Sequence, residues 1–248
     1  MTNGGVLAGE TAIVTGAGRG IGRAVALAFA RAGATVVLSA RTAEQLDETR
    51  REVEAAGGRA VTVRADVTLG SDVEALVAAA LAATGRIDIV VNNAGVFVWK
   101  PFANLDEPEW DRILDTNLKA SYLLIRAALP ALAKSGRGRI VNVASIHGTV
   151  GDANVVAHCA AKFGLIGLTK ALASEVRGAG ITVNALCPGS TDNKSREASP
   201  PKREFPLKEK LRAEDVAEAA LFLSSPAAAA ITGAVLDIWG GNYVAIKG

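Results

Sequence analysis

The chain has 248 residues, of which 50% are hydrophobic, 21% charged and 4% aromatic, with a formal charge of +2 at pH 7. The length suits one large α/β domain or two small ones, and the composition excludes a wholly disordered chain. The near-neutral charge, the few aromatic residues and the lack of an uninterrupted apolar run near the ~20 residues of a bilayer span argue against binding to nucleic acid or membrane.

Short runs rich in β-branched residues alternate with longer amphipathic runs along the whole chain. The short runs are nearly continuous in apolar residues, as expected of strands buried on both faces of a parallel sheet. This pattern predicts a single-domain, doubly wound α/β fold of the Rossmann type over residues 1–248, with helices on both faces of a seven-stranded sheet. The strands are expected at Thr11–Thr15, Thr35–Ser39, Ala60–Ala65, Ile87–Asn92, Arg139–Ala144, Ile181–Leu186 and Ala234–Ile238.

A glycine-rich turn follows the first strand, with the sequence Thr15-Gly16-Ala17-Gly18-Arg19-Gly20-Ile21-Gly22. A strand, a glycine turn and a helix N-terminus together expose backbone N–H groups and a helix dipole to a pyrophosphate, and the missing side chains let the phosphates approach closely. The turn therefore predicts a dinucleotide site with Gly16, Arg19, Gly20, Ile21 and Gly22 as binding residues.

The end of the second strand indicates which dinucleotide fits. An acidic residue there would accept hydrogen bonds from the ribose hydroxyls and repel a 2′-phosphate. The sequence instead reads Leu38-Ser39-Ala40-Arg41, and the Arg41 guanidinium can pair with a phosphate, as can Arg19. We expect NADP(H) to be favoured over NAD(H), although Arg41 alone is also compatible with an ordinary surface position.

Two long helical segments, 107–132 and 155–177, carry more apolar surface than one sheet face needs. Either another subunit covers this apolar surface, in a homodimer or homotetramer, or the surface fills a thick monomer core, and periodicity alone does not choose between them.

Residues 190–211 lack a clear period and contain three prolines, which is typical of a lid over a site. Residues 194–212 hold seven basic and three acidic side chains, so the lid could attract an anionic small-molecule substrate, although a solvated loop explains most such charge runs.

Several motifs resemble those of the short-chain dehydrogenase/reductase family, in particular its 3-oxoacyl-acyl-carrier-protein-reductase-like branch. They comprise the glycine turn, Asp66-Val67 after the third strand, and Asn92-Asn93-Ala94-Gly95, and they occur in the family's order. The resemblance implies that Asp66, Val67, Asn93, Ala94 and Gly95 contact the nucleotide. It also implies a catalytic asparagine at Asn117, a substrate-orienting serine at Ser145, a ribose-binding lysine at Lys162, and nicotinamide contacts from Pro188, Gly189, Thr191 and Asn193, where Asn193 stands in place of the family's usual threonine.

The family's catalytic tyrosine, four residues before that lysine, is replaced by His158. An imidazole can act as an acid or a base, although Lys162 should favour its neutral form. Three interpretations remain open. The protein is a reductase that uses His158 and Ser145, or a relay through Asn117 and Lys162. Alternatively it is a non-redox enzyme of the same fold (a cyclase, dehydratase or isomerase), or it is an inactive or mutated member. His147 is interpreted as a loop histidine, but two histidines in one pocket would favour acid/base chemistry.

From these motifs we expect an NADP(H)-dependent oxidoreductase that interconverts a carbonyl and a secondary alcohol, with Asn117, Ser145, His158 and Lys162 as its catalytic residues. No metal site is expected, because the two histidines and two cysteines lack ligand spacing. Since the N-terminus has no basic segment followed by an apolar one, and the cysteines are few, a cytoplasmic location is expected.

Overall fold

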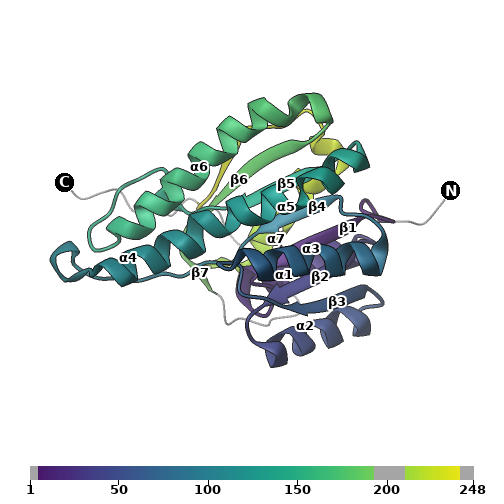
Figure 1. Ribbon diagram of the computed structural model, residues 1–248, viewed down its shortest axis with the longest axis horizontal. Coiled ribbons are helices and arrows are strands. Elements are labelled where there is room, and N and C mark those ends of the chain that lie inside the picture. Colours follow the sequence, from purple (N-terminus) through teal and green to yellow (C-terminus); the bar gives the residue numbers. More distant parts are fainter. Residues whose placement is uncertain (1–4, 193–209, 241–248) are drawn as a thin grey trace.

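The computed structural model describes residues 5–192 and 210–240. Seven strands form one parallel sheet in the order β3-β2-β1-β4-β5-β6-β9, which confirms the predicted fold class (Figure 1). The observed bounds lie close to the predicted ones. The strands are β1 Thr11–Thr15, β2 Thr35–Ala40, β3 Arg59–Arg64, β4 Ile89–Asn92, β5 Arg139–Val143, β6 Thr182–Pro188 and β9 Val235–Ile238.

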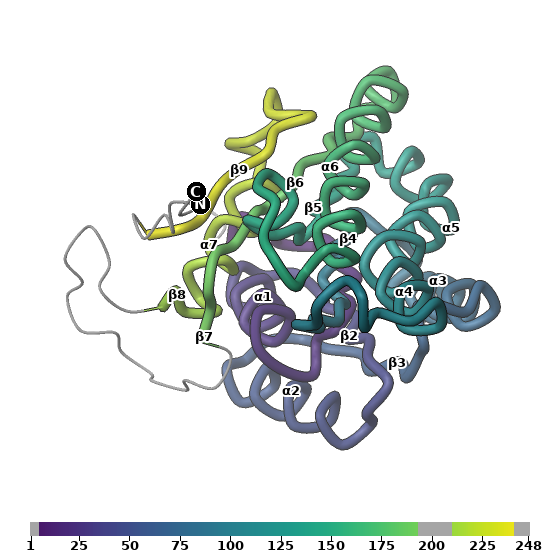
Figure 2. The backbone as a smooth tube through the Cα atoms, turned by 90° about the vertical axis from the view of Figure 1, so that its left-hand side faces the viewer, coloured from purple at the N-terminus to yellow at the C-terminus, as the bar shows by residue number. Residues whose placement is uncertain are grey.

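Helices cover both faces of the sheet, as Figure 2 shows in a view turned by 90°. Alternate strand residues face opposite layers, so Val14 and Leu38 belong to one hydrophobic core and Ile13 and Val37 to the other. The first core is closed by α1 Gly20–Arg31, α2 Ala43–Ala55 and α7 Ala213–Ser224, and the second by α3 Gly70–Thr84, α5 Ala120–Ser135 and α6 Val156–Val176.

The strand order reverses between β1 and β4, which pair with each other although two strands and three helices separate them in the chain. In open α/β sheets a crevice forms at such a reversal, outside the carboxyl ends of the strands. The fold therefore places the segments after β1, β4, β5 and β6 around one opening.

The predicted helical segment 107–132 is not one uninterrupted α-helix. It consists of α4 Glu107–Leu114, a π-helical stretch over Asp115–Lys119, and α5. The buried side chain of Asn117 lies in the π-helical stretch and bonds outside it, a constraint that helical periodicity does not carry.

The region predicted as a lid is described only at its two ends. These form a short parallel pair, β7 Thr191–Asp192 with β8 Leu211–Arg212, so they have strand structure that the sequence pattern did not indicate. The central part of the predicted lid lies outside the described residues.

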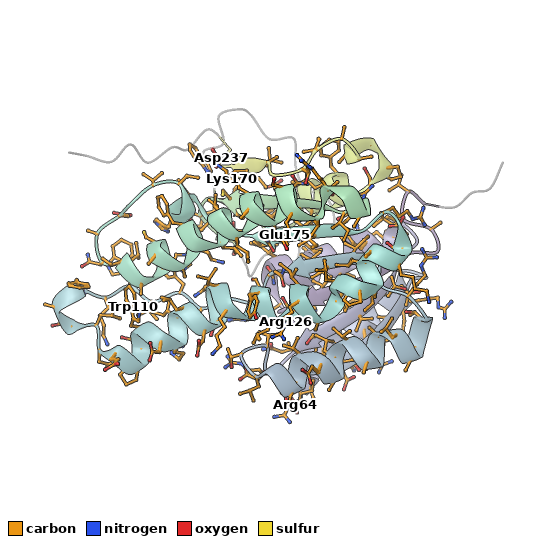
Figure 3. All side chains as sticks on the ribbon, turned by 45° about the horizontal axis from the view of Figure 1, so that its top comes forward. Arg64, Trp110, Arg126, Lys170, Glu175 and Asp237 are labelled. Carbon is orange, nitrogen blue, oxygen red and sulfur yellow. The ribbon has the colours of Figure 1, made fainter. Side chains whose placement is uncertain are left out.

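One helical stretch among the described residues, Val156–Ala179, is long enough and apolar enough to cross a membrane. In its most apolar part, 39% is buried inside the protein. It carries Lys170 and Glu175, both labelled in Figure 3, and its buried residues include Leu165 and Ile166 in a core that also contains Ala185 of β6. These contacts are those of a core helix packed on the sheet.

Candidate active site

A cavity of about 1120 Å³ opens at the carboxyl ends of β1, β4, β5 and β6. Residues far apart in the chain meet there because all four strands are parallel. Of the predicted site residues, the cavity is lined by Gly16, Arg19, Gly20, Ile21, Asn93, Ala94, Gly95, Asn117, Ser145, His158, Lys162, Pro188, Gly189 and Thr191.

The glycine turn lies against the Asn93 side chain with no room for additional atoms. Gly16 has a φ of +64°, which favours glycine, and a Cβ on it would lie 2.8 Å from Asn93 Nδ2. Gly22 does not line the cavity but packs beneath it, where a Cβ would lie 2.3 Å from the Gly16 carbonyl oxygen. Gly22 thus lets the helix approach the turn, while Gly16 lets the turn adopt its conformation.

Hydrogen bonds tie this turn to the end of β4. The Thr15 hydroxyl oxygen accepts from the backbone N–H groups of Asn93 and Ala94, both at 3.0 Å. Asn93 Nδ2 donates to the Thr15 carbonyl at 2.9 Å. The sequence placed Asn93 at the site through the family motif, but it did not indicate that its amide holds β1 and β4 together.

The N-terminus of α1 faces the cavity through Gly20 and Ile21. Its N-cap residue, Arg19, makes no side-chain capping bond, and the first turn contains no acidic residue. Unpartnered N–H groups and the positive end of the helix dipole favour an anion at this position. The turn, its lack of side chains and this helix end therefore fit a dinucleotide pyrophosphate.

Besides Gly22, three predicted nucleotide contacts in the described part of the chain are not among the residues that line the cavity: Arg41, Asp66 and Val67. Arg41 is exposed just after β2, and Arg64 Nε donates to its carbonyl at 3.0 Å. Burial tends to raise the pKa of Asp66, but hydrogen bonds from Thr68 and the charge of Arg41 outweigh it, so this pKa is lowered. The sequence analysis did not single out Arg64, which adds a cation near Arg41.

Asn117 is 1% exposed, and its amide is bonded to backbone on two sides. Nδ2 donates to the Val96 carbonyl at 3.0 Å and to the Ile113 carbonyl at 2.9 Å, while Oδ1 accepts from Val96 N–H at 3.2 Å. The side chain therefore holds the segment after β4 against the π-helical stretch. In this structure it acts as a positioning group.

Lys162 reaches the cavity from α6 and is 5% exposed. Its Nζ donates to the Val143 carbonyl at the end of β5, at 2.8 Å. Burial lowers the pKa of Lys162 to about 8, with Cys187 acting in the opposite direction. An ammonium with one protein acceptor retains further N–H donors, which suits a lysine that binds ligand hydroxyls.

Ser145 follows β5 and caps the short helix Ile146–Gly148. Its Oγ accepts from the His147 backbone N–H at 3.2 Å, so its hydroxyl proton remains available to an acceptor in the cavity. The cap also fixes His147 close to Ser145.

His158 is 7% exposed and lies one helical turn before Lys162 on α6. Burial lowers its pKa to about 4, assisted by the charges of Lys162 and His147 and opposed by a backbone hydrogen bond at Val96. The sequence predicted the direction from Lys162, but burial, the largest cause, depends on tertiary structure. The imidazole is therefore neutral near pH 7.

The sequence analysis did not identify an aromatic wall on the cavity. Phe97 is 55% exposed, and its ring centroid lies 5.0 Å from that of His158, 6.2 Å from that of His147 and 6.4 Å from that of Trp99. Exposed aromatic residues directly after the Asn-Asn-Ala-Gly motif were the available signal. The wall offers an apolar surface to a substrate.

The far side of the cavity is formed by the segment after β6. Pro188, Gly189 and Thr191 line it together with Lys210 and Trp239, and the Thr191 hydroxyl donates to the Gly189 carbonyl at 3.0 Å. Asn193, also predicted to contact the nicotinamide, lies outside the described residues. Among the described residues, no group of three or more His, Cys, Asp or Glu is arranged to hold a metal ion.

A parallel sheet with a reversal of strand order, a glycine turn against an uncapped helix, and a buried lysine near the strand ends are together typical of α/β proteins of the Rossmann type. Residues 10–204 match the family model described as short chain dehydrogenase. The chain belongs to this family.

Relatives in the family cover almost the whole chain. The 3-oxoacyl-[acyl-carrier-protein] reductase FabG of Pseudomonas aeruginosa is 38% identical over 244 residues, which are 96% of this chain and 99% of the relative. The 3-oxoacyl-[acyl-carrier-protein] reductase of Synechocystis is 38% identical over 95% of this chain and 97% of its own. A crystal structure from Sinorhizobium meliloti, of a protein assigned as a short-chain alcohol dehydrogenase, superposes with a TM-score of 0.88 at 39% identity, over 95% of this chain and 96% of that one.

Proposed function

We propose that this protein is an NADP(H)-dependent oxidoreductase that interconverts a carbonyl and a secondary alcohol on a small-molecule substrate. The observation that carries the proposal is the meeting, in one cavity, of the glycine turn, the Asn93–Gly95 segment, Ser145 and Lys162. The names of the relatives support the same chemistry, since 3-oxoacyl reductases act on a carbonyl.

Different residues of the chain would bind the cofactor and orient the substrate. The glycine turn and the α1 N-terminus would hold the pyrophosphate, and Lys162 would bind the nicotinamide ribose. The bound nicotinamide would supply or accept the hydride. Ser145 would orient the substrate oxygen through its hydroxyl proton, and the wall formed by Phe97 would shield the apolar part of the substrate from water. The basic lid predicted from the sequence favours an anionic group on that substrate.

The preference for NADP(H) rests on cations near the end of β2. Arg41 follows the strand with no acidic residue in Leu38-Ser39-Ala40, and Arg64 bonds to its backbone. These guanidinium groups would pair with a 2′-phosphate, while a carboxylate that would accept the ribose hydroxyls is absent from the strand end.

The feature that sets this protein apart from the family pattern is His158 in place of the motif tyrosine. The neighbouring Lys162 and the facing Ser145 remain. We propose that the site transfers hydride with acid/base chemistry supplied by imidazole rather than phenol.

A second candidate, a non-redox enzyme of this fold, is favoured by the two imidazoles in one cavity, 5.8 Å apart between ring centroids. A neutral imidazole can remove a proton from a carbon or an oxygen. In that case the nucleotide would be a scaffold whose oxidation state does not change.

The test combines binding and turnover. Calorimetry with NADPH and NADH measures nucleotide binding, and loss of absorbance of the reduced nicotinamide with a panel of ketones, including 3-oxoacyl thioesters, measures hydride transfer. Substrate conversion without this loss favours the non-redox enzyme, and the lack of binding of either nucleotide contradicts both candidates. His158→Tyr should raise hydride transfer if the histidine is an impaired replacement of the phenol.

The homo-oligomer expected from the sequence is retained as a proposal. Exposed apolar side chains lie on the two long helices that the sequence analysis singled out, including Tyr122 on α5 and Phe163 on α6. Light scattering after size exclusion should give the mass of a dimer or tetramer, and Phe163→Glu should shift it toward the monomer.

A further inference from the structure

Two histidines and a carboxylate stand on one wall of the cavity, and they come from three separate segments. His147 lies on the short helix after β5, His158 on α6, and Asp152 in the connection between them, and all three line the cavity. The two imidazole rings are nearly perpendicular, at 82°, with centroids 5.8 Å apart. Phe97 packs against both rings.

The geometry around His158 disfavours its charged form. An imidazolium has two N–H donors, each of which needs an acceptor when buried. Nδ1 of His158 is fully buried and has no hydrogen-bond partner among the described residues. The ammonium of Lys162 lies one helical turn away. A reductase needs a proton donor at the substrate oxygen, and His158 is poorly placed to carry that proton.

Unlike His158, His147 has a carboxylate next to its ring. Its Nε2 lies 3.5 Å from Asp152 Oδ2, and the carboxylate is half exposed. This carboxylate can accept a hydrogen bond from the ring and orient it. Among the described residues that line the cavity, the other charged or titratable ones are Arg19, His158, Lys162 and Lys210. His147 also lies two residues after Ser145, whose Oγ accepts from the His147 backbone N–H, and both residues line the same cavity.

We propose that His147, paired with Asp152, is the proton donor and acceptor of this active site, and that His158 is a neutral positioning group. The inference rests on the proposed carbonyl reduction. In that direction the hydride from the reduced nicotinamide forms the new C–H bond, and its two electrons reduce the carbonyl carbon. The proton leaves the His147 imidazolium and forms the O–H bond, and solvent reprotonates the imidazole. In the oxidation direction neutral His147 accepts the proton.

A titration tests the charge assignment without any turnover. The chain contains only two histidines, so nuclear magnetic resonance of the imidazole nitrogens gives two sets of signals, which His147→Gln and His158→Gln assign. We expect the histidine that takes up a proton only at the lower pH to be His158, since burial lowers its pKa. If His158 is the first of the two histidines to be protonated, the proposal is wrong.

Kinetics test the role. His147→Gln should lower kcat for ketone reduction by about 10² to 10⁴, the usual contribution of general acid catalysis, with unchanged NADPH binding. Below pH 8, where Lys162 keeps its charge, any fall in rate with rising pH should disappear in this variant and remain in His158→Gln. A pH-dependent limb that persists in His147→Gln assigns the proton to another group and overturns the proposal.

These outcomes distinguish a failure of the proposed redox function from a failure of the role proposed for His147. If the wild type binds NADPH but reduces no ketone while His147 still titrates before His158, the proposed redox function fails and the charge assignment holds. If the wild type reduces a ketone and His147→Gln retains its rate, the function holds and the role of His147 fails.

Discussion

The side chain of Asn117 and the backbone of Val96 exchange two hydrogen bonds, with Nδ2 donating to the Val96 carbonyl at 3.0 Å and Oδ1 accepting from its N–H at 3.2 Å. The pair joins the π-helical stretch to the segment after β4, directly before Phe97. The position of Phe97 in the aromatic wall therefore depends on Asn117, which is 20 residues further along the chain in the π-helical stretch.

Asn117→Ala should loosen that wall. Because the backbone groups of Val96 and the Ile113 carbonyl lose a buried partner, we expect the free energy of unfolding to fall by about 1 to 3 kcal/mol. Urea unfolding measures this, and the KM for ketone should rise while NADPH binding is retained. Asn104→Ala, at an exposed position, is the matched control. Equal stability of the two variants would contradict the role assigned to Asn117.

Gly22→Ala should abolish nucleotide binding or folding, because the added Cβ would lie 2.3 Å from the Gly16 carbonyl oxygen. Gly70→Ala provides the control, since Gly70 also begins a helix, α3, but a Cβ there has no neighbour within 4 Å. Calorimetry with NADPH and thermal unfolding should separate the two variants. An active Gly22→Ala protein with unchanged affinity would show that helix and turn are not packed this closely.

Lys162 makes stability depend on pH in the alkaline range. Its folded-state pKa of about 8 lies below the usual 10.5, so between these values the unfolded chain binds more protons and stability rises with pH. The buried charge destabilises the fold below pH 8 by about 3 kcal/mol, at ~1.4 kcal/mol per pKa unit. Lys162→Met should therefore be more stable than the wild type at pH 7, and the difference should shrink toward pH 10.5. A difference that stays constant from pH 7 to 10.5 would contradict the lowered pKa.

His158 has the corresponding effect in acid. Its pKa of about 4 lies below the usual 6.5, so the unfolded chain takes up a proton in this interval before the folded one does, and stability falls as the pH drops from 6.5 to 4. In His158→Gln the free energy of unfolding should fall by about 2 to 3 kcal/mol less than in the wild type between pH 6.5 and 4. Urea unfolding at several pH values measures this difference. His147→Gln is the comparison variant and should retain most of the loss.

Arg41→Ser should weaken NADPH binding about 10-fold or more, the cost of losing a charge-assisted hydrogen bond to the 2′-phosphate. Affinity for NADH should change little, because NADH lacks this phosphate. Arg59→Ser is the control, since Arg59 begins β3, the strand paired with β2, and lies at the opposite, amino-terminal end of these strands. If both nucleotides lose affinity equally, Arg41 does not select the 2′-phosphate.

The sequence by itself determined the sheet, its buried strands and the glycine turn, because these depend on local periodicity and on residues that are neighbours in the chain. Its motifs also indicated which residues meet at the strand ends, since parallel strands bring their carboxyl ends to one edge. The single helix predicted over 107–132 was wrong in detail, because the π-helical stretch around Asn117 depends on a hydrogen bond to a distant loop.

Only the tertiary structure decided how strongly the charged form of His158 is disfavoured. His158 was predicted to be neutral because of Lys162, but burial among segments from three parts of the chain is the larger cause. His147 was interpreted as a loop histidine, and its pairing with Asp152 and its packing against Phe97 follow from the path of the backbone after β5. Desolvation acts through space, so spacing along the chain does not reveal how far burial lowers the pKa of an imidazole.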